Sequence, residues 1–132
     1  MTLDKFRVFF LQKADAFNRR DWDAMVDDLP DGFEWHFPAG VVDRPGPARS
    51  SELKQAVADL VSPLPDLTAE PFEIVEPVPD SFVVRIHVHG AGASSGASVQ
   101  LELVQLWEFE DDRPVRVREF TNVSEALAKA RQ

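Results

Sequence analysis

Two long segments of the chain alternate apolar and polar side chains, and this pattern constrains the fold more than any other. Apolar residues occupy every second position over 82–88 and, with one interruption, over 99–109. Successive side chains of a strand point to opposite faces, so this period of two predicts strands over 81–89 and 98–110, each with one buried face. The interruption is Gln105, a polar side chain on the apolar face.

The segments before these strands have helical patterns. Thr2 is a suitable N-cap for a helix that runs to about Asn18, and Asp21 can cap a second, shorter helix. A third helix is expected to begin at a cap formed by Ser50 or Ser51. The first helix carries an apolar stripe at helical spacing, formed by Leu3, Phe6, Phe10 and Phe17.

The other segments complete an α+β domain. Strands are expected over 33–37, 67–75 and 115–123, with a short closing helix over 124–130. Residues 38–50 hold three prolines and two glycines, so we expect a loop there that is long enough to act as a lid.

Composition narrows the classes of site and partner. The chain has no cysteine, which excludes disulfides, thiolate metal sites and cysteine nucleophiles. Its net charge of −9 disfavours nucleic acid and anionic lipid as partners. No apolar run reaches the ~18 residues of a membrane span, and the first residues lack the features of a signal peptide. We expect a cytoplasmic protein that binds neither nucleic acid nor membrane.

The apolar faces also predict a register for the first hairpin. Pairing Val88 with Val99 keeps both apolar sets together and places Arg85 opposite Glu102 on the other face, a favourable charge pair. A slip by one residue would turn one apolar set towards solvent.

The last hairpin allows two registers. A three-residue turn pairs Trp107 with Val117, whereas a two-residue turn brings Arg116 and Arg118 inside beside Trp107. The first register is preferred because it buries valines rather than arginines.

The preferred register places Gln105 opposite Glu119 on the inward face. Hydrogen-bonding groups in apolar surroundings need each other, water or a ligand. Two interpretations stay open. In the first the role is only structural, with the two side chains paired in the core or Glu119 exposed to solvent. In the second they line a pocket in which Glu119 accepts a proton. Lys13 lies on the apolar stripe of the first helix, and it would either pair with Glu119 or extend to the helix edge.

The three histidines predict no metal site. His87 and His89 share the outward face of one strand, but no motif supplies the third protein ligand that zinc needs. His36 is opposite in phase to Trp35 and Phe37, so we expect it outside any pocket. Motifs for nucleophile elbows, phosphate loops, dinucleotides and zinc are also lacking.

Four short segments and a closing helix accompany this order of elements. They are FNRRDWDA (17–24), FEWHFP (33–38), VQLWEF (104–109) and VRVREF (115–120), followed by EAL (125–127). In this order they resemble the SnoaL-like group of the nuclear transport factor 2-like superfamily. The resemblance implies a cone-shaped, cystatin-like α+β fold with N-terminal helices packed on a curved antiparallel sheet. Relatives include ketosteroid isomerases, polyketide cyclases and non-catalytic binders, so fold does not settle activity.

Residue by residue, the resemblance is mixed. Phe37 stands where isomerases of this fold carry their basic aspartate, so isomerase-style proton abstraction is not expected. Gln105 falls at the oxyanion-donor position, and its amide can still donate a hydrogen bond. Lys13 lies near the position of a helix-borne tyrosine, and Glu119 matches the acid that cyclases carry in the last strand.

The resulting hypothesis is one domain over residues 1–132 with a pocket for a small apolar molecule and no cofactor. Glu119 and Gln105 would be catalytic, in cyclase-, isomerase- or hydrolase-like acid–base chemistry. The alternative is a non-catalytic module for ligand binding or association. The predicted ligand-binding residues are Lys13, Phe10, Phe17, Trp35, Phe37, Trp107 and Val117.

A homodimer is also expected. Val104, Leu106 and Phe120 point outward in the preferred register and form an apolar patch. Contiguous apolar patches are usually covered, so a second copy is predicted to pack against this face.

Overall fold

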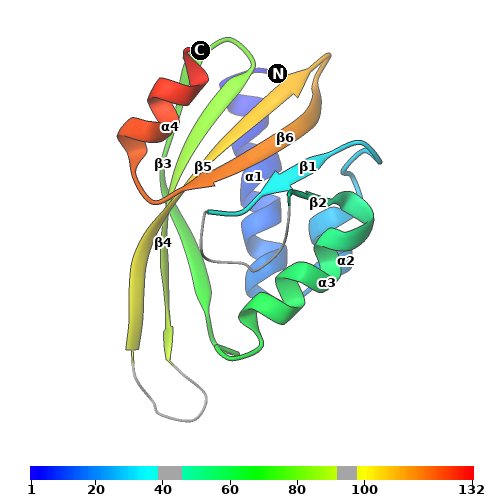
Figure 1. Cartoon of the computed structure of the whole chain (residues 1–132), viewed down its shortest axis with the longest axis vertical. Coiled ribbons are helices and arrows are strands. Elements are labelled where there is room, and N and C mark those ends of the chain that lie inside the picture. Colours follow the sequence, from blue (N-terminus) through cyan, green and yellow to red (C-terminus); the bar gives the residue numbers. More distant parts are fainter. Residues whose placement is uncertain (39–45, 92–97) are drawn as a thin grey trace.

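The structure is a computed structural model that describes residues 1–38, 46–91 and 98–132. A long, curved hairpin of the strands Ser81–Ala91 and Ser98–Glu110 forms its centre (Figure 1). The strands lie in the order β2-β1-β6-β5-β4-β3, antiparallel except for the parallel pair β1–β6. The elements are α1 (Leu3–Asn18), α2 (Trp22–Val26), β1 (Glu34–His36), β2 (Ala48–Arg49), α3 (Ser50–Val61), β3 (Thr68–Val78), β4 (Ser81–Ala91), β5 (Ser98–Glu110), β6 (Arg113–Phe120) and α4 (Val123–Ala130). The predicted α+β architecture is confirmed.

Two of the three predicted helix caps are confirmed. Thr2 Oγ1 accepts the backbone N–H of Lys5 at 3.2 Å, and Asp21 does the same for Ala24 at 3.1 Å. The third cap is wrong, because Ser50 already belongs to α3 and Arg49 is the N-cap residue. Pairing of β2 with β1 holds the chain extended up to Arg49, and α3 begins directly after it at Ser50, one residue earlier than a cap at Ser50 would require.

The register of the β4–β5 hairpin is shifted by two residues from the prediction. Val88 pairs with Leu101 rather than Val99. A shift of two preserves the faces of both strands, so the apolar sets still meet. The Arg85–Glu102 contact survives as a diagonal one, with Nη2 2.8 Å from Oε1.

The β5–β6 hairpin combines features of both predicted registers. The turn has two residues, Asp111 and Asp112, both with positive φ. A β-bulge then leaves Val115 as an extra residue of β6, between the Phe109–Pro114 and Glu108–Arg116 pairs. The bulge restores the preferred register further along the strands, so Gln105 pairs with Glu119 as predicted.

Aromatic rings fill one end of the inward face. Phe6 of α1 stacks on Phe82 of β4 with ring centroids 4.4 Å apart, and Phe109 packs edge-on against both rings. Towards the other end of the hairpin the inward side chains are aliphatic, such as Val88 and Leu101.

Helix α4 covers part of the outward face (Figure 1). Val83, Val104 and Leu106 are fully buried in a cluster with Ala126 of α4, and Phe120 packs against it. The chain thus covers the patch that was expected to face a second copy. That patch gives no support for a homodimer, which stays a prediction.

Two further expectations concern loops and membranes. The predicted lid over 38–50 includes residues 39–45, which lie outside the described residues. Among the described helices, none is long and apolar enough to cross a membrane.

The α4 contact can be tested with a matched pair of substitutions. Ala126→Asp places a carboxylate beneath α4 and should lower the free energy of unfolding by more than about 3 kcal/mol, because the charge would be buried without a partner. Ala128→Asp, on the exposed side of the same helix, should change it by less than about 0.5 kcal/mol. Urea unfolding measures both, and equal effects would contradict the packing described.

Candidate functional site

A cavity of about 470 Å³ lies at the aliphatic end, between the sheet and helices α1 and α3. Its wall is almost entirely apolar. Of the predicted site residues, those that line it are Phe10, Lys13, Phe17, Trp35, Phe37, Gln105, Trp107 and Glu119. Val117 does not line it, because this side chain is fully buried in the core.

Several lining residues were missed by the sequence analysis. Helix α3 contributes Val57, Leu60 and Val61, and the segment after it contributes Leu64 and Leu67. The β4–β5 hairpin adds a further wall of aliphatic side chains, Ile86, Val88, Val99, Leu101 and Leu103. The apolar pattern of these segments was visible, but their assignment to a cavity rather than a packed core depended on how α3 lies against the sheet.

Three polar side chains form a hydrogen-bonded chain across the inward face. The Trp107 Nε1–H donates to Oε1 of Gln105 at 2.9 Å, and Nε2 of Gln105 donates to Oε2 of Glu119 at 2.7 Å. An indole can only donate, so it fixes the Gln105 carbonyl towards Trp107 and the amide N–H groups towards Glu119. The two predicted polar residues therefore meet, with Trp107 as an unpredicted third member.

The Glu119 carboxyl titrates near neutral pH. Burial raises the pKa of Glu119 from 4.5 to about 7, although hydrogen bonding from Gln105 and Trp35 favours the carboxylate and lowers it in part. The surface that Glu119 retains lines the cavity. Within the described residues, Trp35 Nε1 is buried without a partner at full hydrogen-bond geometry, so its interaction with Glu119 is a weak one.

Lys13 does not neutralise Glu119; of the two alternatives for this side chain, the structure shows the extension to the helix edge. Its ammonium group pairs with the carboxylate of Asp28 and lies 5.0 Å from the centre of the Phe9 ring. Lys13 is 8% exposed and lines the cavity, while the Asp28 side chain is 57% exposed. The lysine charge is thus drawn to the edge of the helical layer, because the chain after α2 places Asp28 there.

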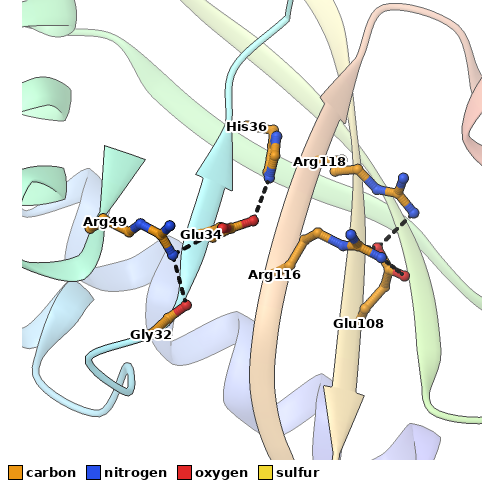
Figure 2. Close-up of polar contacts among 7 residues, drawn as sticks. All are labelled: Gly32, Glu34, His36, Arg49, Glu108, Arg116 and Arg118. Atoms are coloured by element: carbon orange, nitrogen blue, oxygen red, sulfur yellow. Dashed lines mark hydrogen bonds and ion pairs between the residues drawn. The ribbon is translucent and has the colours of Figure 1, made fainter. Parts of the chain in front are cut away.

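A second group of charges lies on the outward face of β1, β5 and β6 (Figure 2). His36 Nε2 is 3.0 Å from Glu34 Oε1, and His36 is absent from the cavity wall, as predicted. Glu108 accepts hydrogen bonds from Arg116 and pairs with Arg118 at 2.8 Å. Burial disfavours the Glu108 carboxylate, but the two arginines outweigh it and lower its pKa. These ionic groups mainly satisfy one another.

The outward histidines have a neighbour that the sequence analysis did not anticipate. Glu70 of β3 pairs with His87 in the sheet, and its Oε1 lies 2.9 Å from Nε2 of His89. The prediction that no third ligand-type side chain lies near the two histidines is therefore wrong. Only the register between β3 and β4 brings Glu70 there, and no sequence motif records it.

Comparisons with known proteins agree with this geometry. The family model described as SnoaL-like domain matches residues 11–117. A comparison with curated proteins gave no match.

Solved structures share the fold. An NTF2-like protein of unknown function from Burkholderia pseudomallei has a TM-score of 0.75 and 21% identity, covering 97% of each chain. AclR from Streptomyces galilaeus, a proposed hydroxylase, has a TM-score of 0.74 and 18% identity, and the match covers 98% of this chain and 97% of AclR. IdmH from Streptomyces antibioticus, a proposed polyketide cyclase, has a TM-score of 0.74 and 19% identity, and the match covers 93% of this chain and 96% of IdmH. At these identities the likeness shows the nuclear transport factor 2-like fold, which confirms the prediction.

The raised pKa of Glu119 predicts how stability depends on pH. Between pH 4.5 and about 7 the folded chain binds more protons at Glu119 than the unfolded chain, so stability should fall as pH rises through this window. The difference in pKa corresponds to roughly 3 kcal/mol as an upper bound. Glu119→Gln should remove this loss, making the variant more stable than the parent at about pH 8 and similar to it at about pH 4.5.

Urea unfolding across this pH range measures the effect. Glu110→Gln is the matched control, because Glu110 lies on the neighbouring strand but is exposed. The control should follow the parent curve at every pH. If Glu119→Gln did so too, the burial of Glu119 would be contradicted.

Proposed function

The chain belongs to the SnoaL-like family, and we propose that it is a cofactor-free acid–base enzyme acting on a small, largely apolar carbonyl compound. One observation carries this proposal: the Glu119 carboxyl lies on the wall of an apolar cavity with its pKa raised to about 7. A carboxyl group with this pKa is present in both protonation states near neutral pH. It can therefore act as base and as acid in one reaction cycle.

The cavity supports the proposed substrate class. Its volume of about 470 Å³ is in the range of small-molecule pockets. Strongly charged molecules are disfavoured, because they would lose their hydration against an apolar wall. A neutral molecule of a few rings, with an oxygen directed at the polar end, fits both conditions.

The polar end supports proton transfer next to a carbonyl group. Glu119 would take a proton from the carbon beside the carbonyl; the electron pair of that C–H bond would form a carbon–carbon double bond, and the π pair of the C=O bond would move to the oxygen. The second N–H of Gln105 and the indole N–H of Trp35 are two donors on the cavity wall that could stabilise that oxygen. Glu119 would then return the proton to another atom, so the reaction needs no oxidant or reductant.

The structural neighbours add a candidate within this class. IdmH is named as a proposed polyketide cyclase, and a polyketide-like carbonyl compound meets the size and polarity requirements of this cavity. Phe37 lines the cavity where isomerases of this fold have their base, so in this chain Glu119 would have to supply that base from β6.

A non-catalytic binding module is the second candidate. It is favoured by the small number of ionisable groups on the wall. Among the described lining residues these are Lys13, Glu102 and Glu119, and the first two are paired with Asp28 and Arg85. A binder would use the cavity without a proton moving to Glu119.

A photoacid distinguishes the two functions without knowledge of the substrate. 2-Naphthol is small, neutral and apolar, and becomes a strong acid when excited. Bound in the cavity, it should transfer its proton to ionised Glu119 and emit as naphtholate, with an increase centred near pH 7. Excitation at wavelengths beyond tryptophan absorption removes tryptophan emission, and subtraction of the emission of free 2-naphthol at the same pH isolates the signal of the bound molecule.

Glu119→Gln should bind 2-naphthol but lose the naphtholate emission, and Glu110→Gln should behave as the parent. Binding with the same emission in the parent and in Glu119→Gln at every pH would leave the non-catalytic module as the better account. Failure of the parent to bind 2-naphthol would count against the proposed apolar substrate class.

A further inference from the structure

The outward face of β3 and β4 carries a cluster of three ligand-type side chains. We propose that Glu70, His87 and His89 form a binding site for a divalent transition-metal ion, with Zn²⁺ as the best fit. The site is on the opposite face of the sheet from the cavity, and it does not depend on the proposed function.

The backbone places the three side chains on one face. His87 and His89 are two residues apart in β4, so both point outward, with ring centroids 5.2 Å apart. Glu70 is directly opposite His87 on the antiparallel neighbour β3. One ligand atom from each residue lies within 4.8 Å of the others. Two adjacent strands thus hold the cluster without any loop.

These distances are close to what a bound ion requires. Zinc bonds of about 2.0–2.2 Å set tetrahedral ligand atoms roughly 3.3 Å apart. The Glu70–His89 contact, at 2.9 Å, is already within that separation. Rotation of the His87 ring towards Glu70 and His89 would shorten the remaining ligand-atom distances. Among the described residues, no hydrogen bond holds the His87 ring in place.

The surroundings leave room for an ion. β3 is the edge strand of the sheet, so the cluster is open to solvent on one side. On the other neighbouring strand, β5, Glu102 lies opposite His87 and Gln100 lies opposite His89. Glu102 is held by Arg85, which leaves a water molecule as the expected fourth ligand. The net charge of −9 favours accumulation of cations around the chain.

The donor set selects the class of metal. Two imidazoles and one carboxylate suit Zn²⁺, Ni²⁺ and Cu²⁺, whereas Mg²⁺ and Ca²⁺ prefer oxygen ligands. Because Glu70 comes from the edge strand and the histidines from its neighbour, a bound ion would join β3 to β4. We therefore expect Zn²⁺ to stabilise the fold as well as to bind.

Titration of tag-free protein with Zn²⁺ against a chromophoric chelator tests the site. The expected result is one saturable ion per chain, with a rise in melting temperature. Loss of a residue that only hydrogen-bonds to a metal ligand already lowers metal affinity by about 10- to 100-fold. Loss of a ligand itself, in His87→Ala or His89→Ala, should therefore lower the Zn²⁺ affinity by at least about 100-fold. Glu70→Gln should also weaken binding, and Mg²⁺ should not compete.

His36→Ala is the matched control. It removes the one other histidine of the chain, which lies on β1 beside Glu34. This variant should keep the affinity and the thermal shift of the parent. His87→Gln replaces His87→Ala should the alanine variant prove unfolded by circular dichroism. The proposal is overturned by an absence of saturable one-to-one binding, by retention of affinity in the His87 and His89 variants, or by an equal loss in His36→Ala.

Discussion

One extra residue in β6 determines the chemistry of the inward face. The two-residue turn at Asp111–Asp112, continued without interruption, would turn Arg116 and Arg118 towards the core. The bulge at Val115 reverses the phase of the strand, so the arginines face outward and Glu119 faces the cavity. The salt bridges of Glu108 and the buried carboxyl of Glu119 are therefore two results of the same backbone irregularity.

The inward position of Glu119 has its effect because, within 1–38, 46–91 and 98–132, no cation contributes to its pKa. Lys13 is close enough to line the same cavity, but its charge is committed to Asp28. Gln105 and Trp35 stabilise the carboxylate only in part, so burial remains the larger influence and the pKa stays raised. The Trp107–Gln105 hydrogen bond directs the amide N–H groups of Gln105 to Glu119, which links the aromatic core to the polar end of the cavity.

Much of this arrangement follows from local patterns in the sequence. Alternation predicted β4 and β5, the caps at Thr2 and Asp21 predicted two helices, and the pairing of Gln105 with Glu119 followed from the preference for buried valines. Long-range placement could not be predicted in the same way. The partner of Lys13, the position of Glu70 and the covering of Leu106 by α4 depend on how separate elements pack. Neither alternation nor capping contains that information.

The central claim is that the Glu119 carboxyl is buried and titrates near neutral pH. A direct measurement is the pH titration of the side-chain carboxyl carbon by ¹³C NMR, with the Glu119 signal assigned by its loss in Glu119→Gln. The account predicts a midpoint near pH 7 for this signal. A midpoint close to the ordinary value of 4.5 would contradict it and would remove the basis for acid–base chemistry in this cavity.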